Sequence, residues 1–371
     1  MKKISVIGIG KLGICYALNL ERAGYDVLGV DVNQEYVDAI NNKEIESPEP
    51  EVSDLLTSSK NFRATTDLKE AIDFSGILFI LVRTPSLENG RYDHSTVDDL
   101  IEKINLLGKQ QERKHFIVGC TVMPGYCNSI EDNLSELNYS LSYNPEFIAQ
   151  GTIIRDQLRP DMVLIGTDDD GAFSAMEEIY LTLCENEPAT HRMSPISAEI
   201  TKIALNCFIT AKITFANMIG DIAISSGADY EKILYAIGSD SRVGNKYLGY
   251  GYGFGGPCFP RDNRALFIHS DDVNYDAKLS KIIDDANEYH LDFQVNEYIR
   301  THQDKETPIV IDSVTYKKGS VIIEESQQLL YAVKIAEAGY NVVLTDSNEV
   351  LRNVEKEYGN LFKYEPKDMD A

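Results

Sequence analysis

Lys3-Ile-Ser-Val-Ile-Gly8-Ile-Gly10-Lys-Leu-Gly13 begins the chain, a helix-forming stretch follows, and Tyr25-Asp-Val-Leu-Gly-Val-Asp31 completes the segment. The order is a buried strand, a G-x-G-x-x-G turn, a helix and a second strand that ends in an acid. This order is typical of the βαβ unit that binds a dinucleotide, with the pyrophosphate at the helix N-terminus. The segment therefore predicts an α/β protein whose N-terminal domain has the Rossmann fold.

Each glycine of this turn is required for a different physical reason. Gly8 permits the tight turn, Gly10 lets a pyrophosphate approach the backbone, and Gly13 lets the helix pack closely on the strand. Asp31 would accept hydrogen bonds from the adenosine ribose and repel a 2′-phosphate, so NAD is predicted rather than NADP. The cofactor-binding residues predicted here are Gly8, Ile9, Gly10, Lys11, Leu12, Gly13 and Asp31.

Further strands and helices follow in alternation. Apolar strands are expected at 77–82, 115–120 and 141–146. Ligands lie at the carboxyl ends of parallel strands, so Val82, Thr84, Pro85 and Thr121 are expected to line the nicotinamide end of the cofactor. Three helices are expected at 195–227, 229–237 and 277–303. Strands at 308–314 and 340–346 around a helix at 325–338 predict a second, smaller α/β unit.

Composition excludes several classes of protein. The 371 residues suffice for two or three domains, and a net charge of −24 argues against nucleic acid or anionic membranes as partners. No apolar run is expected to reach the length of a membrane span, and a first strand at residue 4 leaves no room for a signal peptide. The six cysteines contain no C-x-x-C pair, which favours a reducing cytoplasm, and no metal is expected.

A second informative stretch is Gly251-Tyr-Gly-Phe-Gly-Gly-Pro-Cys258-Phe-Pro-Arg-Asp262. Glycines let a ligand approach the backbone, and a thiol there becomes a nucleophile if its thiolate is favoured. The alternative is a turn with a buried cysteine that packs as a small hydrophobe. Lys202 and Asn206, one helical turn apart, offer a cation and an amide to an oxyanion beside Cys258, or else are incidental polar residues.

Several motifs together resemble those of the UDP-glucose/GDP-mannose dehydrogenase family. They are the N-terminal fingerprint, Val82-Arg-Thr-Pro85, Thr121-Val-Met-Pro-Gly125, Asn144-Pro-Glu-Phe147, Glu199-Ile-Thr-Lys-Ile-Ala-Leu-Asn206, and Ile237-Gly-Ser-Asp-Ser-Arg-Val-Gly-Asn-Lys-Tyr-Leu248 running into Gly253–Asp262. They occur in family order from residue 1 to about 345. The resemblance implies a Rossmann NAD-binding domain at 1–190, a central region with a long helix at 191–300, and a smaller, shortened Rossmann-like α/β domain at 301–371.

The resemblance also implies an activity, the four-electron oxidation of UDP-glucose to UDP-glucuronate with two NAD⁺. Cys258 attacks the C6 aldehyde to form a thiohemiacetal, whose oxyanion Lys202 and Asn206 stabilise, and a thioester follows. By resemblance, Asp262 and Glu146 serve the proton transfers, Glu146 through a water held with Thr121. Gln150 stands at the cofactor site.

The resemblance further implies a set of substrate contacts and a homodimer. The residues are Glu146, Phe147, Lys202, Asn206, Arg242, Gly249, Tyr250, Gly253, Phe254, Gly255, Tyr316 and Lys317. Arg242 is expected to reach the substrate of a partner subunit, and Lys317 to hold the nucleotide sugar. A cytoplasmic enzyme of polysaccharide biosynthesis is the expectation.

Some residues depart from the family pattern. Gln150 stands where a glutamate is usual, Pro257 replaces a serine, Tyr36 replaces a lysine or arginine, and Glu324 replaces an arginine; the chain also ends at Ala371, before a further strand. Two hypotheses therefore stay open. The first is a working dehydrogenase of UDP-glucose, or alternatively of GDP-mannose or a UDP-N-acetylhexosamine. The second is a nucleotide-sugar- or NAD-binding homologue with impaired turnover.

Overall fold

The computed structural model describes residues 1–47 and 49–367, and it divides into two compact units, Met1–Lys202 and Ile203–Ala371. Each unit is described by itself. Residues Asp368–Ala371, on which the expectation of a shortened C-terminal domain partly rests, lie outside the described residues.

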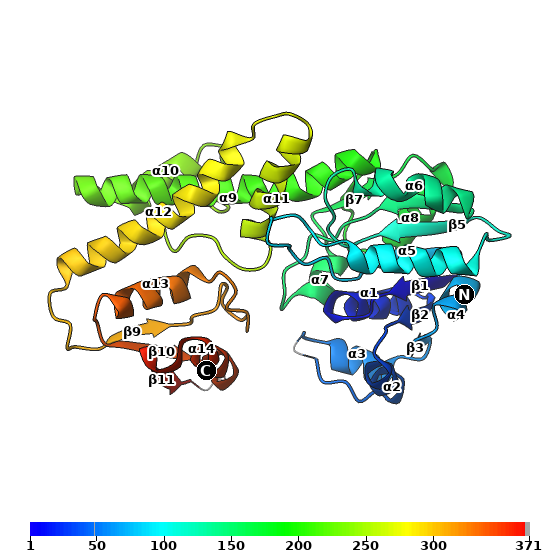
Figure 1. The fold of residues 1–371 in the computed structure, drawn as a ribbon, viewed down its shortest axis with the longest axis horizontal. Helices are drawn as coiled ribbons and strands as arrows, with labels where there is room; N and C mark the ends of the chain where they lie inside the picture. The colour runs from blue at the N-terminus through cyan, green and yellow to red at the C-terminus, as the bar shows by residue number, and fades with distance from the viewer. Residues whose placement is uncertain (48, 368–371) are drawn as a thin grey trace. The chain divides into compact units, whose positions relative to one another are not determined.

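The first unit is built on an eight-stranded sheet with the strand order β3-β2-β1-β4-β5-β6-β7-β8 (Figure 1). The strands are β1 (Lys3–Ile7), β2 (Asp26–Val30), β3 (Phe62–Thr65), β4 (Ile77–Ile80), β5 (Lys114–Val118), β6 (Tyr139–Tyr143), β7 (Met162–Gly166) and β8 (Ala189–Met193). Neighbours are parallel except β6 and β7, which pair antiparallel at Tyr143 and Gly166. The predicted Rossmann-type fold is confirmed, and the sheet adds an antiparallel junction between β6 and β7.

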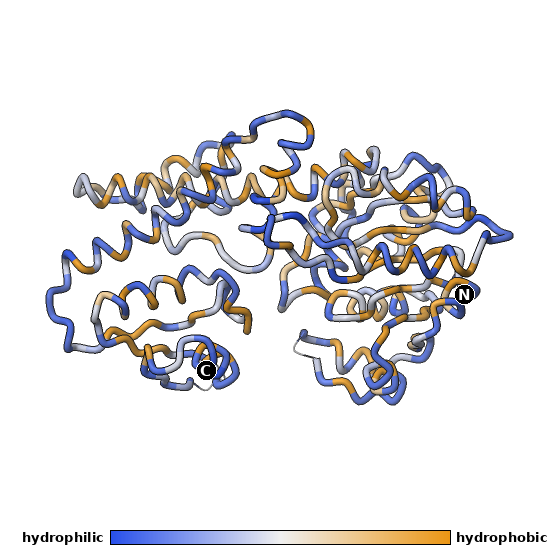
Figure 2. The backbone as a smooth tube through the Cα atoms, in the orientation of Figure 1, coloured by the Kyte–Doolittle hydropathy of each residue, from blue (hydrophilic) through white to orange (hydrophobic). Residues whose placement is uncertain are grey.

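Helices cover both faces of this sheet. They are α1 (Lys11–Arg22), α2 (Gln34–Asn42), α3 (Val52–Ser58), α4 (Leu68–Phe74), α5 (Ser95–Leu107), α6 (Tyr126–Glu136), α7 (Ile153–Leu158) and α8 (Asp170–Leu183). Side chains alternate along each strand, so Ile4 and Val6 pack in one core with α1, α7 and α8, while Ile7 packs in the other with α4, α5 and α6. Figure 2 shows the apolar strands between helices that carry polar residues.

The second unit combines long helices with a small parallel sheet. Its helices are α9 (Pro195–Ser226), which begins in the first unit, α10 (Tyr230–Gly238), α11 (Phe259–Asp272), α12 (Lys278–Thr301), α13 (Gln327–Glu337), α14 (Asn348–Tyr358) and the short η1 (Gly359–Leu361). The sheet has the order β11-β10-β9, from β9 (Ile309–Asp312), β10 (Val342–Asp346) and β11 (Lys363–Pro366). Its core joins this sheet to α12, α13 and α14 through residues such as Leu291, Ile335 and Leu344.

Helix α9 corrects the expectation that no apolar stretch is long enough for a membrane span. Among the described residues it is the one helix that is long and apolar enough, with a mean hydropathy of 1.4 over its most apolar window. The sequence expectation was wrong because polar residues such as Lys202 and Lys212 interrupt the apolar run without ending the helix. The core helix of a globular protein meets the same criterion of length and composition, so a single such helix is weak evidence for a membrane.

Candidate active site

The glycine turn between β1 and α1 has the geometry that a dinucleotide requires. Gly8 adopts φ +90°, which is open to glycine and strained for other residues. A Cβ atom on Gly13 would lie 1.9 Å from the Gly8 carbonyl oxygen, so the close approach of helix and turn excludes any side chain there. A Cβ on Gly10 would meet nothing within 4 Å. The space beside Gly10 thus lies open to a ligand at the uncapped N-terminus of α1.

The carboxyl ends of β1, β4 and β5 meet beside this turn. A Cβ on Gly8 would lie 2.7 Å from the Leu81 carbonyl oxygen and 3.0 Å from Val82. Thr84 donates a hydrogen bond of 2.6 Å to the Thr121 carbonyl and so ties the two following loops together. Of the residues predicted to line the cofactor, the structure therefore brings Gly8, Val82, Thr84 and Thr121 to one edge of the sheet.

Asp31 and Tyr36 lie at the end of the candidate cofactor site that would hold the adenosine. The Asp31 carboxylate accepts the Asn33 backbone N–H at 3.0 Å just beyond β2. The Tyr36 hydroxyl donates to the Ile9 carbonyl at 2.9 Å, and burial, followed by the charge of Asp31, raises the pKa of Tyr36 to about 12. Tyr36 therefore braces the glycine turn at the position where the family resemblance implies a lysine or arginine. With open space at Gly10, a helix N-terminus and an acid after β2, these residues fit NAD.

Two buried glutamates to which the sequence analysis gave no role hold loops of the first unit. Glu49, 4% exposed, accepts the Gly151 N–H at 2.8 Å and thereby fixes the segment after Gln150. Glu199, with no exposed surface, accepts the N–H groups of Gly125 and Cys127 at 2.6 and 2.9 Å. It caps the N-terminus of α6, where a carboxylate also interacts favourably with the helix dipole. Glu199 ties the Thr121–Gly125 loop to α9.

Lys202, three residues after Glu199, turns toward the segment that follows β6. Its Nζ donates to the Glu146 carbonyl at 2.6 Å and lies 4.5 Å from the centre of the Phe147 ring. The predicted substrate residues Glu146, Phe147 and Lys202 are thus brought together in the first unit. Gln150 lies near the glycine turn, because its Oε1 is 3.4 Å from Lys11 Nζ.

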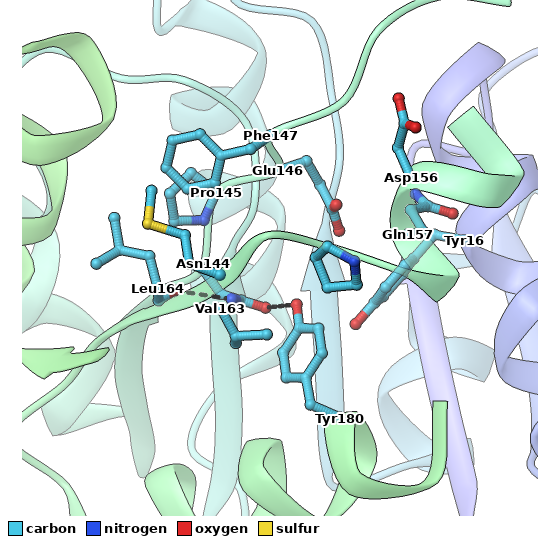
Figure 3. A pocket seen from close by; sticks show the side chains of 12 residues that line it. Tyr16, Asn144, Pro145, Glu146, Phe147, Asp156, Gln157, Val163, Leu164 and Tyr180 are labelled. Atoms are coloured by element: carbon cyan, nitrogen blue, oxygen red, sulfur yellow. Dashed lines mark hydrogen bonds between the residues drawn. The ribbon is translucent and has the colours of Figure 1, made fainter. Parts of the chain in front are cut away.

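The Glu146 carboxyl points into a small polar cavity (Figure 3). The cavity has a volume of about 20 Å³, room for roughly one water molecule, and its lining includes Tyr16, Asn144, Gln157 and Tyr180. The Tyr180 hydroxyl donates to Asn144 Oδ1 at 2.6 Å. Burial raises the pKa of Glu146 to about 7, with the nearby Lys202 ammonium opposing the rise. A carboxyl that titrates near neutral pH can both accept and donate a proton.

The raised pKa of Glu146 predicts a stability effect. Because the folded state binds this proton more tightly than the unfolded chain, the stabilisation is full below about pH 4.5 and is lost as pH rises to about 7. Glu146→Gln is therefore expected to gain about 3 kcal/mol over the native protein at pH 8 and almost nothing at pH 4.5. Urea unfolding at both pH values measures this. The exposed control Glu102→Gln should show no such pH dependence, and equal behaviour of the two variants would contradict the prediction.

Cys258 is distinct among the six cysteines, all of which lie in the described part of the chain. It is exposed, whereas Cys15, Cys120, Cys127 and Cys207 are buried and Cys184 is half-buried. Burial raises the pKa of Cys15, Cys120 and Cys207 to about 12 and that of Cys184 to about 11. Cys258 stands at the N-cap of α11, where backbone N–H groups favour an anion such as a thiolate. The nucleophile interpretation is therefore favoured over the buried turn.

Asn206 and Asp262 lie together in the second unit. Asn206 Nδ2 donates to Asp262 Oδ2 at 2.6 Å, and Asp262 is 1% exposed. The Asp262 N–H bonds the Cys258 carbonyl at 2.9 Å in the first turn of α11. The structure thus joins three of the predicted catalytic residues, Asn206, Cys258 and Asp262, through one helix turn and one side-chain hydrogen bond.

The glycine-rich loop before Cys258 is packed rather than flexible. A Cβ on Gly253 would lie 2.2 Å from Asn287 Oδ1, and one on Gly255 would lie 2.1 Å from the Glu325 carbonyl oxygen. Asn287 also exchanges two hydrogen bonds with the Phe254 backbone, at 2.9 and 2.8 Å. The close packing alone therefore excludes a side chain at Gly253 and Gly255, independently of any contact with a ligand.

The remaining predicted substrate residues also lie in the second unit. The Tyr316 ring packs on Gly256, and Lys317 is exposed one residue later. Glu324 accepts the Gly256 N–H at 3.0 Å through its carbonyl. Arg242 is 87% exposed in its side chain and pairs with Asp240 at 2.7 Å. Such an exposed pair is weak, which leaves the guanidinium available to a ligand.

Comparisons with known proteins agree with this geometry. Residues 2–184 match the NAD-binding domain of the UDP-glucose/GDP-mannose dehydrogenase family, and residues 196–289 match its central domain. The chain is 28% identical over 92% of its length to a UDP-glucose 6-dehydrogenase of Haloferax volcanii, covering 82% of that protein. It is 30% identical over 93% of its length to a GDP-mannose 6-dehydrogenase of Pseudomonas aeruginosa, covering 81%.

A solved structure extends the likeness to the whole chain. A UDP-glucose dehydrogenase of Pyrobaculum islandicum superposes with a TM-score of 0.88 at 27% identity, over 99% of this chain and 86% of that one. The two domain matches cover well over half of the chain and include the glycine turn, Lys202 and Cys258. The chain belongs to the UDP-glucose/GDP-mannose dehydrogenase family, whose members are NAD-dependent nucleotide-sugar dehydrogenases.

Proposed function

We propose that this protein oxidises UDP-glucose to UDP-glucuronate in a four-electron reaction. The observation that carries the proposal is the exposed thiol of Cys258 at the N-terminal end of α11, one turn from Asp262. A two-electron oxidation of an alcohol has no use for a placed thiol. A four-electron oxidation can use one, because a thiohemiacetal can lose a second hydride to become a thioester.

Each predicted site residue has a separate role in the proposed reaction. Two NAD⁺ molecules, held one after the other by the glycine turn and Asp31, would each accept one hydride, the first from the alcohol and the second from the thiohemiacetal. Cys258 adds its sulfur to the C6 aldehyde carbon, and the ammonium of Lys202 and the amide of Asn206 stabilise the oxyanion that forms. After the thioester forms, water adds and the C–S bond breaks, which returns the thiolate. Asp262 and Glu146, the latter through a water held with Thr121, take up the protons of the alcohol and of this water.

The nucleotide sugar is assigned to residues of the predicted central region 191–300 and C-terminal domain 301–371, together with Phe147. The loop from Gly249 to Gly255 lies against the sugar, and Tyr316 and Lys317 hold the nucleotide. Gln150 contacts the cofactor as an amide, without the charge of the usual glutamate. The proposal thus includes three parts of the chain: an NAD-binding domain at 1–190, a central region at 191–300 and a C-terminal domain at 301–371.

A homodimer in the cytoplasm is proposed as the active form. On α9, Phe208, Phe215, Met218 and Ile222 are 66%, 43%, 48% and 55% exposed, and their spacing places them on one face. Large exposed apolar patches mark association sites. In such a dimer Arg242 would reach the partner's substrate, as the family resemblance implies. Light scattering on the purified protein tests this, and a monomer at all concentrations would contradict it.

GDP-mannose is the alternative substrate, because the relative from Pseudomonas aeruginosa bears that name. The deciding experiment measures NADH formed from limiting UDP-glucose, GDP-mannose or UDP-N-acetylmannosamine. Two NADH for each UDP-glucose, and none from the others, is the expected result. Two NADH from another sugar would overturn the substrate, while tight NAD binding without NADH from any sugar would favour the impaired homologue, with Gln150 and Glu324 as its likeliest cause.

A further inference from the structure

A buried polar cluster of the second unit anchors the loop around Gly251. His290 on α12 and Asp221 on α9 are 3% and 8% exposed. His290 Nδ1 lies 2.8 Å from Asp221 Oδ2, and His290 Nε2 lies 2.8 Å from the Gly251 carbonyl oxygen. The imidazole therefore bridges a helix carboxylate and the backbone of the loop that precedes Cys258.

The partners of His290 determine where its protons lie. A backbone carbonyl only accepts, so Nε2 carries a proton. Asp221 Oδ1 also accepts the Tyr250 hydroxyl at 3.0 Å, which favours the ionised carboxylate, and Nδ1 then donates to it as well. A histidine that donates from both nitrogens is an imidazolium.

The surroundings of the imidazole tie it closely to the loop. Tyr250 meets the His290 ring edge-on at 5.4 Å between ring centroids, and Gln294 Nε2 donates to the same Gly251 carbonyl at 3.0 Å. Asn217 Oδ1 accepts the Gly251 N–H at 3.1 Å. The groups that face the imidazole are thus Asp221 from α9, Tyr250 and Gly251 from the loop, and Gln294 from α12.

We propose that the His290–Asp221 ion pair is a positioning device that holds the Gly251 segment in its substrate-binding conformation. If the imidazolium loses a proton, either tautomer leaves a nitrogen lone pair facing an acceptor, the Asp221 carboxylate or the Gly251 carbonyl. The loop then loses one anchor and nucleotide-sugar binding weakens. The choice of ligand rests on the proposed function, whereas the protonation state of the pair does not.

The first test needs no substrate. The chain has six histidines, so ¹⁵N-histidine labelling gives a small set of ring signals, and the signal lost in His290→Gln assigns His290. Both ring nitrogens of His290 are expected to carry protons, because each faces an acceptor, Asp221 or the Gly251 carbonyl. A His290 nitrogen that is unprotonated at the acidic end of the range in which the protein stays folded would overturn the ion pair.

The second test follows the loop itself. The chain contains no tryptophan, so Tyr252→Trp places a single fluorophore in the loop. Its emission is expected to shift at the same pH at which the His290 signals titrate. An emission that stays constant through that titration would show that the pair does not position the loop.

The third test measures the affinity for UDP-glucose by calorimetry at pH values below and above the change that the His290 ring signals show. The native protein is expected to lose roughly tenfold in affinity across that change. In Asp221→Asn the amide donates to Nδ1 of a neutral His290 that still donates to Gly251, so affinity should be independent of pH. The affinity of His290→Gln for UDP-glucose should also be independent of pH. The exposed control His191→Gln should show the same dependence of affinity on pH as the native protein.

The outcomes separate the two proposals. A native-like fall in the affinity of His290→Gln would overturn the role of the pair. Failure of UDP-glucose to bind any form would contradict the proposed function, while the ring signals and the fluorescence would still decide the ion pair.

Discussion

Replacing Cys258 by serine is expected to abolish the formation of two NADH per UDP-glucose. A serine hydroxyl is far less nucleophilic than a thiolate, and an ester formed through it would lack the reactive thioester carbonyl. We expect the steady-state rate to fall by about 10³-fold or more. Spectrophotometric assay of NADH with limiting UDP-glucose, together with analysis of the sugar product, measures the loss.

Cys184→Ser provides the matched control for this variant. Cys184 is half-buried, and burial raises the pKa of its thiol to about 11, so its removal should leave the stoichiometry at two NADH. Binding of NAD to both variants shows that they are folded. A Cys258→Ser enzyme that still forms two NADH at a tenth of the native rate would rule out the thioester.

The second large effect concerns the glycine turn, where two substitutions by alanine should fail for different reasons. In Gly13→Ala the new Cβ would lie 1.9 Å from the Gly8 carbonyl, so the turn must open, and a loss of about 2 kcal/mol in unfolding free energy is expected together with loss of NAD binding. In Gly10→Ala the new methyl meets nothing within 4 Å, so stability should be unchanged. The methyl instead occupies the space of the pyrophosphate, and NAD affinity should fall more than tenfold.

Thermal unfolding without cofactor and calorimetric titration with NAD separate the two effects. A Gly10→Ala protein that binds NAD as tightly as the native protein would contradict the placement of the pyrophosphate. An unchanged melting temperature for Gly13→Ala would contradict the close contact between turn and helix.

Local patterns were sufficient to predict the scaffold of the first unit. The prediction of a strand, a glycine turn and a helix from Lys3 to Arg22 agrees with the structure. It succeeds because the periodicity of apolar residues and the residue types of a turn are set by neighbouring residues. Strands β3 and β8 were not predicted, because β3 has only four residues and β8 is largely exposed, so their apolar patterns are weak. Strand β7 was missed although its sequence, MVLIG, is apolar and mostly buried. Membership of the family is shown, while the role of each site residue stays a prediction.

Contacts between distant segments could not be predicted from the sequence. Glu199 lies among apolar residues at the start of α9, and this position was a usable signal for a buried acid. Nothing near His290 indicates Asp221, which is 69 residues away. The loop glycines are a second example of a contact that the sequence does not reveal. From the sequence, Gly253 and Gly255 suggest only that a ligand approaches the backbone, whereas the structure shows that they also pack against Asn287 and Glu325.

The contrast between Cys258 and the five other thiols makes the protein selectively vulnerable. Alkylating reagents and peroxides act on thiolates, and burial keeps the other cysteines protonated or out of reach. A haloacetamide at neutral pH should therefore label one position per chain, and the amount of label would count competent active sites in any preparation. Under the proposed function, oxidation of this one sulfur atom would stop turnover, reversibly at the sulfenic acid stage and permanently beyond it.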